Sequence, residues 1–257
     1  MDREFASLST FFVEEEIYPM IAFHQVTKSF PINGSMLPIV KVKHWTVEAG
    51  ERVALIGPSG SGKSTLLHLA SGVLPVDSGE ITVADHPIHR YSEGQRDRYR
   101  AQMIGYIFQD FHLISSLSAR QNVELVLPPA WTKQQRREEV DRWFELVGLQ
   151  DRQKHLPAQL SRGQQQRVAM IRALIGNAPL ILADEPTGSL DWETAGEVMS
   201  LLLSLCESEK RTLLTVTHDL HLARLFPKTV HISELNELVR KTNEAESSAD
   251  SKGERVG

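Results

Sequence analysis

Residues 52–65 read RVALIGPSGSGKST, an apolar run followed by a loop rich in glycine and serine. The loop fits the pattern G-x-x-x-x-G-K-[ST], in which glycines let the backbone wrap phosphate groups. We expect a strand at Arg52–Ile56 and a helix at Lys63–Ala70, and a loop between such elements binds phosphate through free backbone N–H groups. The complete spacing favours a phosphate cradle over an incidental Gly/Ser-rich turn. The predicted nucleotide-binding residues of this cradle are Gly57, Pro58, Ser59, Gly60, Ser61, Gly62, Lys63, Ser64 and Thr65.

Short apolar runs recur along the chain and alternate with helical patterns. Runs of this length suit strands buried on both faces of a parallel sheet, and the alternation indicates right-handed crossovers. The expected strands are Arg52–Ile56, Ile104–Phe108, Leu180–Ala183, Thr212–Val216 and Thr229–Ile232; the expected helices are Lys63–Ala70, Lys133–Val147, Arg162–Ile175 and Glu193–Cys206. The runs at Ile39–Val47 and Gly79–Ala84 look antiparallel and half exposed. The prediction is an α/β fold with a mostly parallel sheet, an antiparallel β part, and a helical insertion.

Polar side chains follow three of the expected strands. Asp184 and Glu185 end one strand, Gln109 ends another, and His218 ends a third. The carboxyl ends of parallel strands meet at one sheet edge, where the phosphate cradle also lies. There Lys63 would reach the β- and γ-phosphates, and Ser64, Asp184 and Gln109 would contact Mg²⁺. Glu185 would orient or deprotonate the attacking water, and His218 would bind the γ-phosphate. A single polar residue at a strand end is usually only an exit residue, but this convergence favours a catalytic site.

Bulk composition excludes several classes of protein. The 257 residues carry a net charge of -5, which gives no reason to expect binding to nucleic acid. The single Cys206 cannot form an internal disulfide and fits a reducing compartment. No apolar run approaches the roughly eighteen residues that cross a bilayer, and the acidic N-terminus is unlike a secretory signal. We therefore expect a cytoplasmic protein, and another chain would supply any spanning helices.

The two ends of the chain differ in composition from its middle. We expect an N-terminal extension at 1–19, with Met20 as a possible native start, and a disordered polar tail at 239–257. Residues 20–238 would form the folded domain, with its helical part at about 110–175. N-terminal sequencing of the native protein would test the alternative start.

A second glycine-containing turn lies about a hundred residues after the first. Residues 159–167 read QLSRGQQQR, with Ser161 and Gly163 at the expected start of a helix. A helix start presents free N–H groups to an anion. The order GPSGSGKST, IFQ, LSRGQQQRV, LILADEPTGSLD and THD resembles the ATP-binding-cassette (ABC) ATPases over roughly Ile21 to Ile232. The loop LSRGQ resembles the signature that separates this family from other P-loop NTPases.

The resemblance explains why one chain would carry two such turns. In this family two nucleotide-binding domains pack head to tail, and each ATP lies between the P-loop of one and the signature loop of the other. Ser161, Gly163 and Gln164 would therefore bind the nucleotide of a second copy. Ser189-Leu190-Asp191 matches the loop that reports across the interface, and Phe30 matches the aromatic residue that stacks on adenine. A core aromatic at a strand end is an equal alternative for Phe30.

The family pattern is LSGGQ, and Arg162 replaces its first glycine. Arg162 could add positive charge near the phosphates or point into the helical region, and we favour a tolerated surface residue. If the position required a backbone that only glycine adopts, turnover would suffer. His86, His89 and His112 have no partner spacing and suggest no metal site.

A single cassette without a membrane span resembles a stand-alone ATPase subunit that dimerises and docks a separate permease. Its ligands would be ATP and Mg²⁺, and it would lie on the inner face of the cell membrane. Phe111, Leu113 and Ile114, after Gln109, could contact the permease or belong to the core. GYIFQDFHLI and SARQNVELVL look most like the lipoprotein-release and macrolide-export branch. The alternatives are a regulatory ATPase of the cell-division machinery and a soluble translation or nucleic-acid ATPase; the single cassette and the lack of basic clusters argue against the latter.

Overall fold

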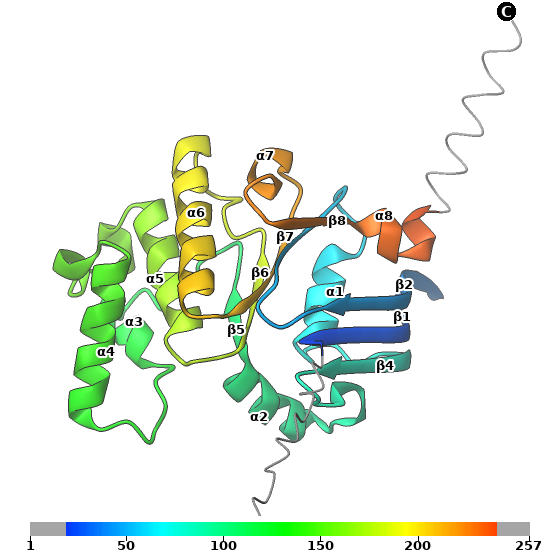
Figure 1. Ribbon diagram of the computed structural model, residues 1–257, viewed down its shortest axis with the longest axis horizontal. Coiled ribbons are helices and arrows are strands. Elements are labelled where there is room, and N and C mark those ends of the chain that lie inside the picture. The colour runs from blue at the N-terminus through cyan, green and yellow to red at the C-terminus, as the bar shows by residue number, and fades with distance from the viewer. Residues whose placement is uncertain (1–18, 241–257) are drawn as a thin grey trace, which may run out of the picture.

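The computed structural model describes residues 19–240, and its centre is a parallel sheet (Figure 1). The strand order is β5-β6-β7-β3-β8, and every neighbouring pair is parallel. The strands are β3 (Arg52–Ile56), β5 (Ile104–Ile107), β6 (Leu180–Asp184), β7 (Thr212–Thr217) and β8 (Lys228–His231). The loops that follow β3, β5, β6 and β7 therefore leave the sheet at one edge, as the sequence predicts.

Alternation along the strands divides the interior into two hydrophobic clusters. In β3, Ala54 faces one cluster, whereas Val53 and Leu55 face the other. The first cluster packs the sheet against α5 (Arg162–Leu174) and α6 (Trp192–Ser208). The second packs it against α1 (Lys63–Ala70) and the antiparallel sheet. Burial on both faces explains why these strands read as continuous apolar runs.

The antiparallel sheet lies at one end of the molecule (Figure 1). Its order is β2-β1-β4, with β1 (Ile21–Ile32), β2 (Ser35–Val47) and β4 (Ser78–Val83). Asn33 and Gly34 join β1 to β2 with φ of 50° and 80°, the backbone that a tight two-residue hairpin requires. The Phe23 and Trp45 rings stack on the inner face with centroids 5.5 Å apart.

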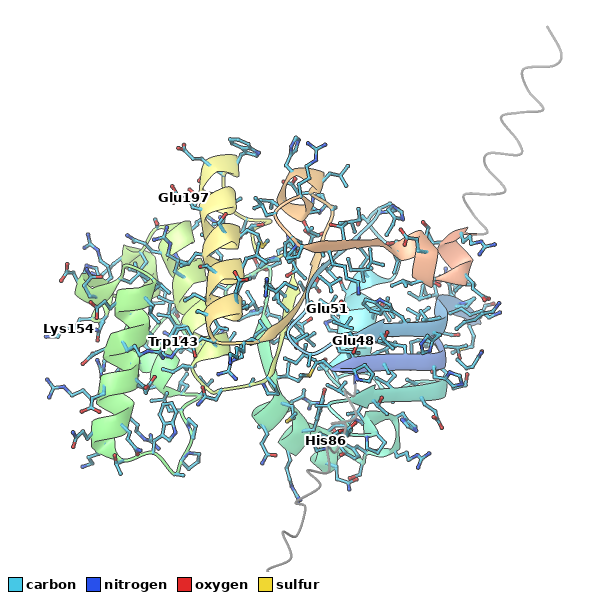
Figure 2. The ribbon with its side chains drawn as sticks, viewed as in Figure 1. Glu48, Glu51, His86, Trp143, Lys154 and Glu197 are labelled. Atoms are coloured by element: carbon cyan, nitrogen blue, oxygen red, sulfur yellow. The ribbon has the colours of Figure 1, made fainter. Side chains whose placement is uncertain are left out.

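The helical part lies at the opposite end of the molecule (Figure 1). It contains α3 (Ala119–Glu124) and α4 (Lys133–Leu146), which pack with α5. Ser118, Thr132 and Ser161 cap these three helices, each with a glutamine three residues later whose side chain bonds back to the cap. Trp143, labelled in Figure 2, is buried in the cluster that joins α4 to α5.

The predicted fold class is confirmed, and the predicted strand and helix ranges agree with the structure within a few residues. The helix α2 (Glu93–Met103) was missed, because its sequence is strongly polar and Tyr99 alone is buried. The remaining elements are short: α7 (Leu220–Ala223), α8 (Ile232–Leu235), and 3₁₀ turns at Ile88–Arg90, Gln150–Arg152 and Pro157–Gln159. The predicted extension and tail lie almost entirely outside the described residues. Across 19–240, no helix is long and apolar enough to span a membrane.

Candidate nucleotide-binding site

A cavity of about 610 Å³ opens at the sheet edge where the polar residues were predicted to converge. Residues from the loop after β3, from the ends of β5, β6 and β7, and from the antiparallel sheet form its wall. Its lining residues are Phe30, Ile39, Ser59, Gly60, Gly62, Lys63, Ser64, Thr65, Gln109, Asp184, Glu185 and His218. All of these except Ile39 were named from the sequence. The volume falls in the range of pockets for small molecules and cofactors.

The loop Gly57–Thr65 has the backbone of a phosphate cradle. Gly57 has φ of 147°, and a Cβ there would lie 2.4 Å from the Ile232 methyl carbon, so glycine is required for both conformation and space. Gly62 is the N-cap of α1 with φ of 93°. The first turn of α1 therefore opens at the cavity, where its free N–H groups favour an anion. Gly57, Pro58 and Ser61 shape this loop without lining the cavity.

Lys63 is the main positive charge of the cavity wall. Its ammonium group donates to the carbonyls of Gly57 and Pro58, each at 2.9 Å, and the side chain is almost fully buried. Burial lowers the pKa of Lys63, and the nearby carboxylates of Glu185 and Asp184 act in the opposite direction. A partly desolvated ammonium held at the mouth of the cradle is suited to pairing with phosphate oxygens.

Ser64 and Asp184 form an oxygen-rich pair beside the cradle. The Ser64 hydroxyl donates to Asp184 Oδ1 at 2.9 Å, and the Gln109 amide lines the same cavity. A hydroxyl, a carboxylate and an amide oxygen are hard ligands that fit Mg²⁺, which keeps several waters and completes its shell with phosphate oxygens. No cluster of three or more His, Cys, Asp or Glu residues in the described part of the chain could hold a metal without such help.

Glu185 and His218 meet across the ends of β6 and β7. His218 Nδ1 lies 2.8 Å from Glu185 Oε1. Glu185 has φ of 46°, a left-handed backbone that costs energy for a residue with a Cβ. Hydrogen bonds on both sides hold it there: its N–H donates to Val216 O at 3.0 Å, and its carbonyl accepts from Gly188 N at 3.0 Å. These bonds hold the Glu185 backbone directly after Asp184, and the contact with His218 holds the carboxylate in the cavity wall, where it could activate a water.

The turn at Ser161–Gln164 does not line this cavity. Ser161 caps α5, and its backbone N–H donates to the Gln164 side-chain oxygen at 3.0 Å. A Cβ on Gly163 would lie 2.6 Å from the Thr194 methyl, so a larger residue here would displace Thr194 and disturb the packing of α5 against α6. From the resemblance, we expected the turn Ser161–Gln164 to meet the phosphate cradle of a second copy. Within one chain the turn lies outside the cavity that the cradle lines.

Arg162 is the first residue of α5 and has an ordinary helical backbone, so the position makes no conformational demand for glycine. Its guanidinium lies over the Phe111 ring, 5.8 Å from the centroid. The side chain is exposed, and it points toward the loop after Gln109. Of the three apolar residues predicted in that loop, Phe111 is buried, Leu113 packs against the core, and Ile114 is exposed.

Two supporting residues were missed from the sequence. Gln166 is fully buried on α5, and its amide donates to Pro186 O, directly after Glu185. Asn236 is also fully buried, and its amide donates to Ile39 O at 2.8 Å and Ser61 O at 3.2 Å. Gln166 stands in the run QQQ, where only its helical phase could have separated it from its neighbours. Asn236 lies outside every motif and carried no signal.

Comparisons with known proteins agree with this site. The family model described as "ABC transporter" matches residues 40–188. The chain is 42% identical over 205 residues to the "Uncharacterized ABC transporter ATP-binding protein YbbA" of Escherichia coli K12, covering 79% of this chain and 90% of that protein. It is 39% identical over 201 residues to the "Lipoprotein-releasing system ATP-binding protein LolD" of Treponema denticola, with coverage of 78% and 89%.

A solved structure is similar in fold. It is the "Dimeric structure of a post-hydrolysis state of the ATP-binding cassette MJ0796 bound to ADP and Pi", at 35% identity and a TM-score of 0.75, covering 84% of this chain and 94% of that one. MJ0796 is a protein of Methanocaldococcus jannaschii, and its sequence is 37% identical to this chain over 220 residues. With the phosphate cradle, the carboxylate pair and the signature turn in place, the chain belongs to the ABC transporter family as one of its ATP-binding, ATP-hydrolysing subunits.

Proposed function

We propose that this chain hydrolyses ATP as a homodimer that closes around two ATP molecules and drives a separate membrane permease. The observation that carries the proposal is the incomplete cavity. The P-loop, Asp184, Glu185 and His218 line it, whereas Ser161 and Gly163 of the same chain do not. A second copy placed head to tail would bring its signature turn to this cavity, as two copies of a related cassette form a dimer in the solved structure.

Each group in the cavity has a role in phosphoryl transfer, which depends mainly on positioning and charge stabilisation. Lys63 and the N–H groups of the cradle bind the β- and γ-phosphates. Ser64, Asp184 and Gln109 would hold a magnesium ion, which would neutralise phosphate charge. Glu185 positions or deprotonates the attacking water, and His218, whose Nδ1 lies 2.8 Å from Glu185 Oε1, binds the γ-phosphate. Phe30 lines the cavity beside Ile39 and would stack on the adenine.

An apolar groove supports a membrane partner. A cavity of about 560 Å³ lies between β5 and α3, and its lining includes Tyr106, Phe108, Leu125 and Val126. Leu125 is 56% exposed, an unusual position for leucine unless another surface covers it. Arg172 fixes the adjoining loop by donating to Phe111 O and His112 O at 2.8 and 2.6 Å. A permease segment seated here would be linked through this loop to Gln109 in the nucleotide cavity.

The similarity to LolD proteins favours a lipoprotein-release or export type of machine, with the chain docked on the inner face of the cell membrane. To test this, a tagged Glu185→Gln chain is added to native membranes in MgATP, and the proteins that co-purify are identified. A permease with few spans and a large extracytoplasmic domain supports the proposal. A many-spanning permease retains transport and excludes this branch, and recovery of division proteins alone contradicts the proposal.

The docking groove provides a matched control for that experiment. Leu125→Asp places a charge on the groove, at a residue that does not line the nucleotide cavity, and is expected to abolish co-purification while leaving ATP binding intact. Ser204→Asp, on α6, is the control substitution. Equal recovery with Leu125→Asp and Ser204→Asp would show that the permease binds elsewhere.

A further inference from the structure

Trp192 is a large apolar side chain left open to solvent beside the motifs of the site. The side chain is 74% exposed, whereas Trp45 and Trp143 are 6% and 2% exposed. Trp192 is the first residue of α6 and directly follows Ser189-Leu190-Asp191. An indole ring has the largest apolar surface of any side chain and gains most when another surface covers it.

The backbone that carries Trp192 is held rigidly. Asp191 caps α6 by accepting a hydrogen bond from Thr194 N at 3.0 Å. In the loop before it, Ser189 Oγ donates to Gln109 O at 3.2 Å, and Leu190 N donates to Thr187 O at 3.0 Å. A ring displayed from a rigid element loses little conformational freedom when it binds, which is what an interface anchor requires.

The ring also has a fixed place relative to the signature turn. The Thr194 methyl fills the space in which Gly163 has no side chain, so the N-terminus of α6 rests on the N-terminus of α5. Trp192 therefore stands beside the turn that the proposed function directs toward a second copy. The first residue of α7, Leu220, lies two positions after His218 and is 58% exposed, so a second apolar side chain borders the same motifs.

Other occupants fit this surface less well. The proposed permease groove is lined by Ala173 and Gly176, at the C-terminal end of α5, whereas Trp192 lies near its N-terminal end. A helix of 13 residues separates these ends by about 20 Å. Asp191 and Glu193 flank the ring, and paired carboxylates would be repelled by an anionic lipid surface.

We propose that Trp192 is an anchor of the ATP-bound homodimer, in which its ring is buried against the second copy of this chain. The inference rests on the proposed function and adds a contact to it that involves neither nucleotide nor metal. Aromatic residues, tryptophan above all, dominate the binding energy of protein interfaces when they are buried next to the central contacts. The ring would thus favour closure without touching the reacting atoms.

The first test measures dimerisation by sedimentation of the Glu185→Gln chain in MgATP. Adding Trp192→Ala is expected to raise the dimer Kd at least about tenfold, as for an interface anchor. Leu146→Ala removes an exposed apolar side chain at the far end of α4 and is expected to leave the Kd unchanged. If Trp192→Ala and Leu146→Ala give the same Kd, the inference is overturned and the proposed function stands.

The second test follows the ring itself. Tryptophan emission of the Glu185→Gln chain should shift to shorter wavelength when MgATP is added, and the shift should be absent in Trp192→Phe. A dimer that forms without the shift overturns the inference alone. A Glu185→Gln chain that stays monomeric overturns the inference together with the proposed function. A shift caused by anionic vesicles without nucleotide would assign the ring to a membrane and would also overturn it.

Discussion

The two glycine-containing turns reach similar sequences for different physical reasons. In the loop Gly57–Thr65, glycines adopt positive φ so that the backbone can fold around a cavity. In the turn Ser161–Gln164, Gly163 has a helical backbone, and it is the Thr194 side chain that packs where a Cβ would lie. The first turn encloses a site within its own chain, and the second presents an open surface. Of the glycines in these two turns, those with positive φ belong to the loop that lines the nucleotide cavity, and the helical Gly163 belongs to the turn that lies outside it.

The largest loss of ATP turnover is expected from a substitution of Glu185. Glu185→Gln removes the group that would activate water, and loss of a general base lowers turnover about 100-fold or more. ATP should still bind, so the dimer should persist in MgATP. Phosphate release and sedimentation measure the two effects, with Glu197→Gln on the exposed face of α6 as control. A Glu185→Gln chain that hydrolyses ATP at the wild-type rate would exclude Glu185 from catalysis.

The comparison of the two turns predicts that a substitution in the phosphate cradle weakens ATP binding by one protomer. A substitution in the turn Ser161–Gln164 weakens the ATP-dependent dimer. Lys63→Ala removes a charged donor to phosphate and should weaken ATP binding by an isolated protomer about 100-fold. Ser161→Ala should leave that binding unchanged and weaken the ATP-dependent dimer instead. Calorimetric titration at low protein concentration and sedimentation at high concentration separate the two quantities. Weakened ATP binding by the Ser161→Ala monomer would mean that both turns serve the same nucleotide.

A smaller loss of kcat is expected when the hydrogen bond between Gln166 on α5 and the loop after Glu185 is removed. Gln166→Leu removes the hydrogen bond to Pro186 O and loosens the loop that positions Glu185. We expect kcat to fall about tenfold, the effect of one buried hydrogen bond, while the ATP affinity of the monomer stays unchanged. Gln134→Leu, where the amide donates to Glu138 on the exposed face of α4, is the control. Equal losses in kcat and affinity would indicate general destabilisation instead of misplacement.

The smallest effect is expected at Arg162. Its backbone is ordinary and its contact with Phe111 is an exposed cation–π pair, worth about 0.5–1 kcal/mol. Arg162→Gly should therefore change the ATPase rate by less than about fivefold. Phe111→Leu combined with Arg162→Gly should be no worse than Phe111→Leu alone. A many-fold gain in rate with Arg162→Gly would show that this arginine hinders the signature turn.

The sequence predicted the elements that periodicity or a motif defines. The strand Arg52–Ile56 and the helix Lys63–Ala70 were predicted to the residue, because a fully apolar run and a cradle mark their ends. Helix α2 was not predicted, since it covers the sheet with one tyrosine and is otherwise polar. Strand β2 begins at Ser35, four residues before the predicted start at Ile39, because Asn33-Gly34 sets the turn before it and its first residues bury little.

The residues of the candidate site also fall into those that the sequence predicted and those that it did not. Residues that would touch the nucleotide carry motifs, and the structure gathers Lys63, Asp184, Glu185 and His218 around one cavity. Residues that hold those groups in place do so through buried hydrogen bonds between segments far apart in the chain. Gln166 and Asn236 act in this way, and no local pattern marks them. The exposure of Trp192 also depends on tertiary packing, which a single sequence does not display.

Asn236 is synthesised long after the phosphate cradle that it contacts. Its amide binds Ser61 O from the phosphate cradle and Ile39 O from β2, and its Oδ1 accepts from Lys41 N. Ser61 of the cradle emerges from the ribosome 175 residues before the side chain that binds it. A nascent chain still lacking Asn236 leaves Ser61 O and Lys41 N without this partner. The cradle therefore gains this hydrogen-bond partner only after synthesis has passed residue 236.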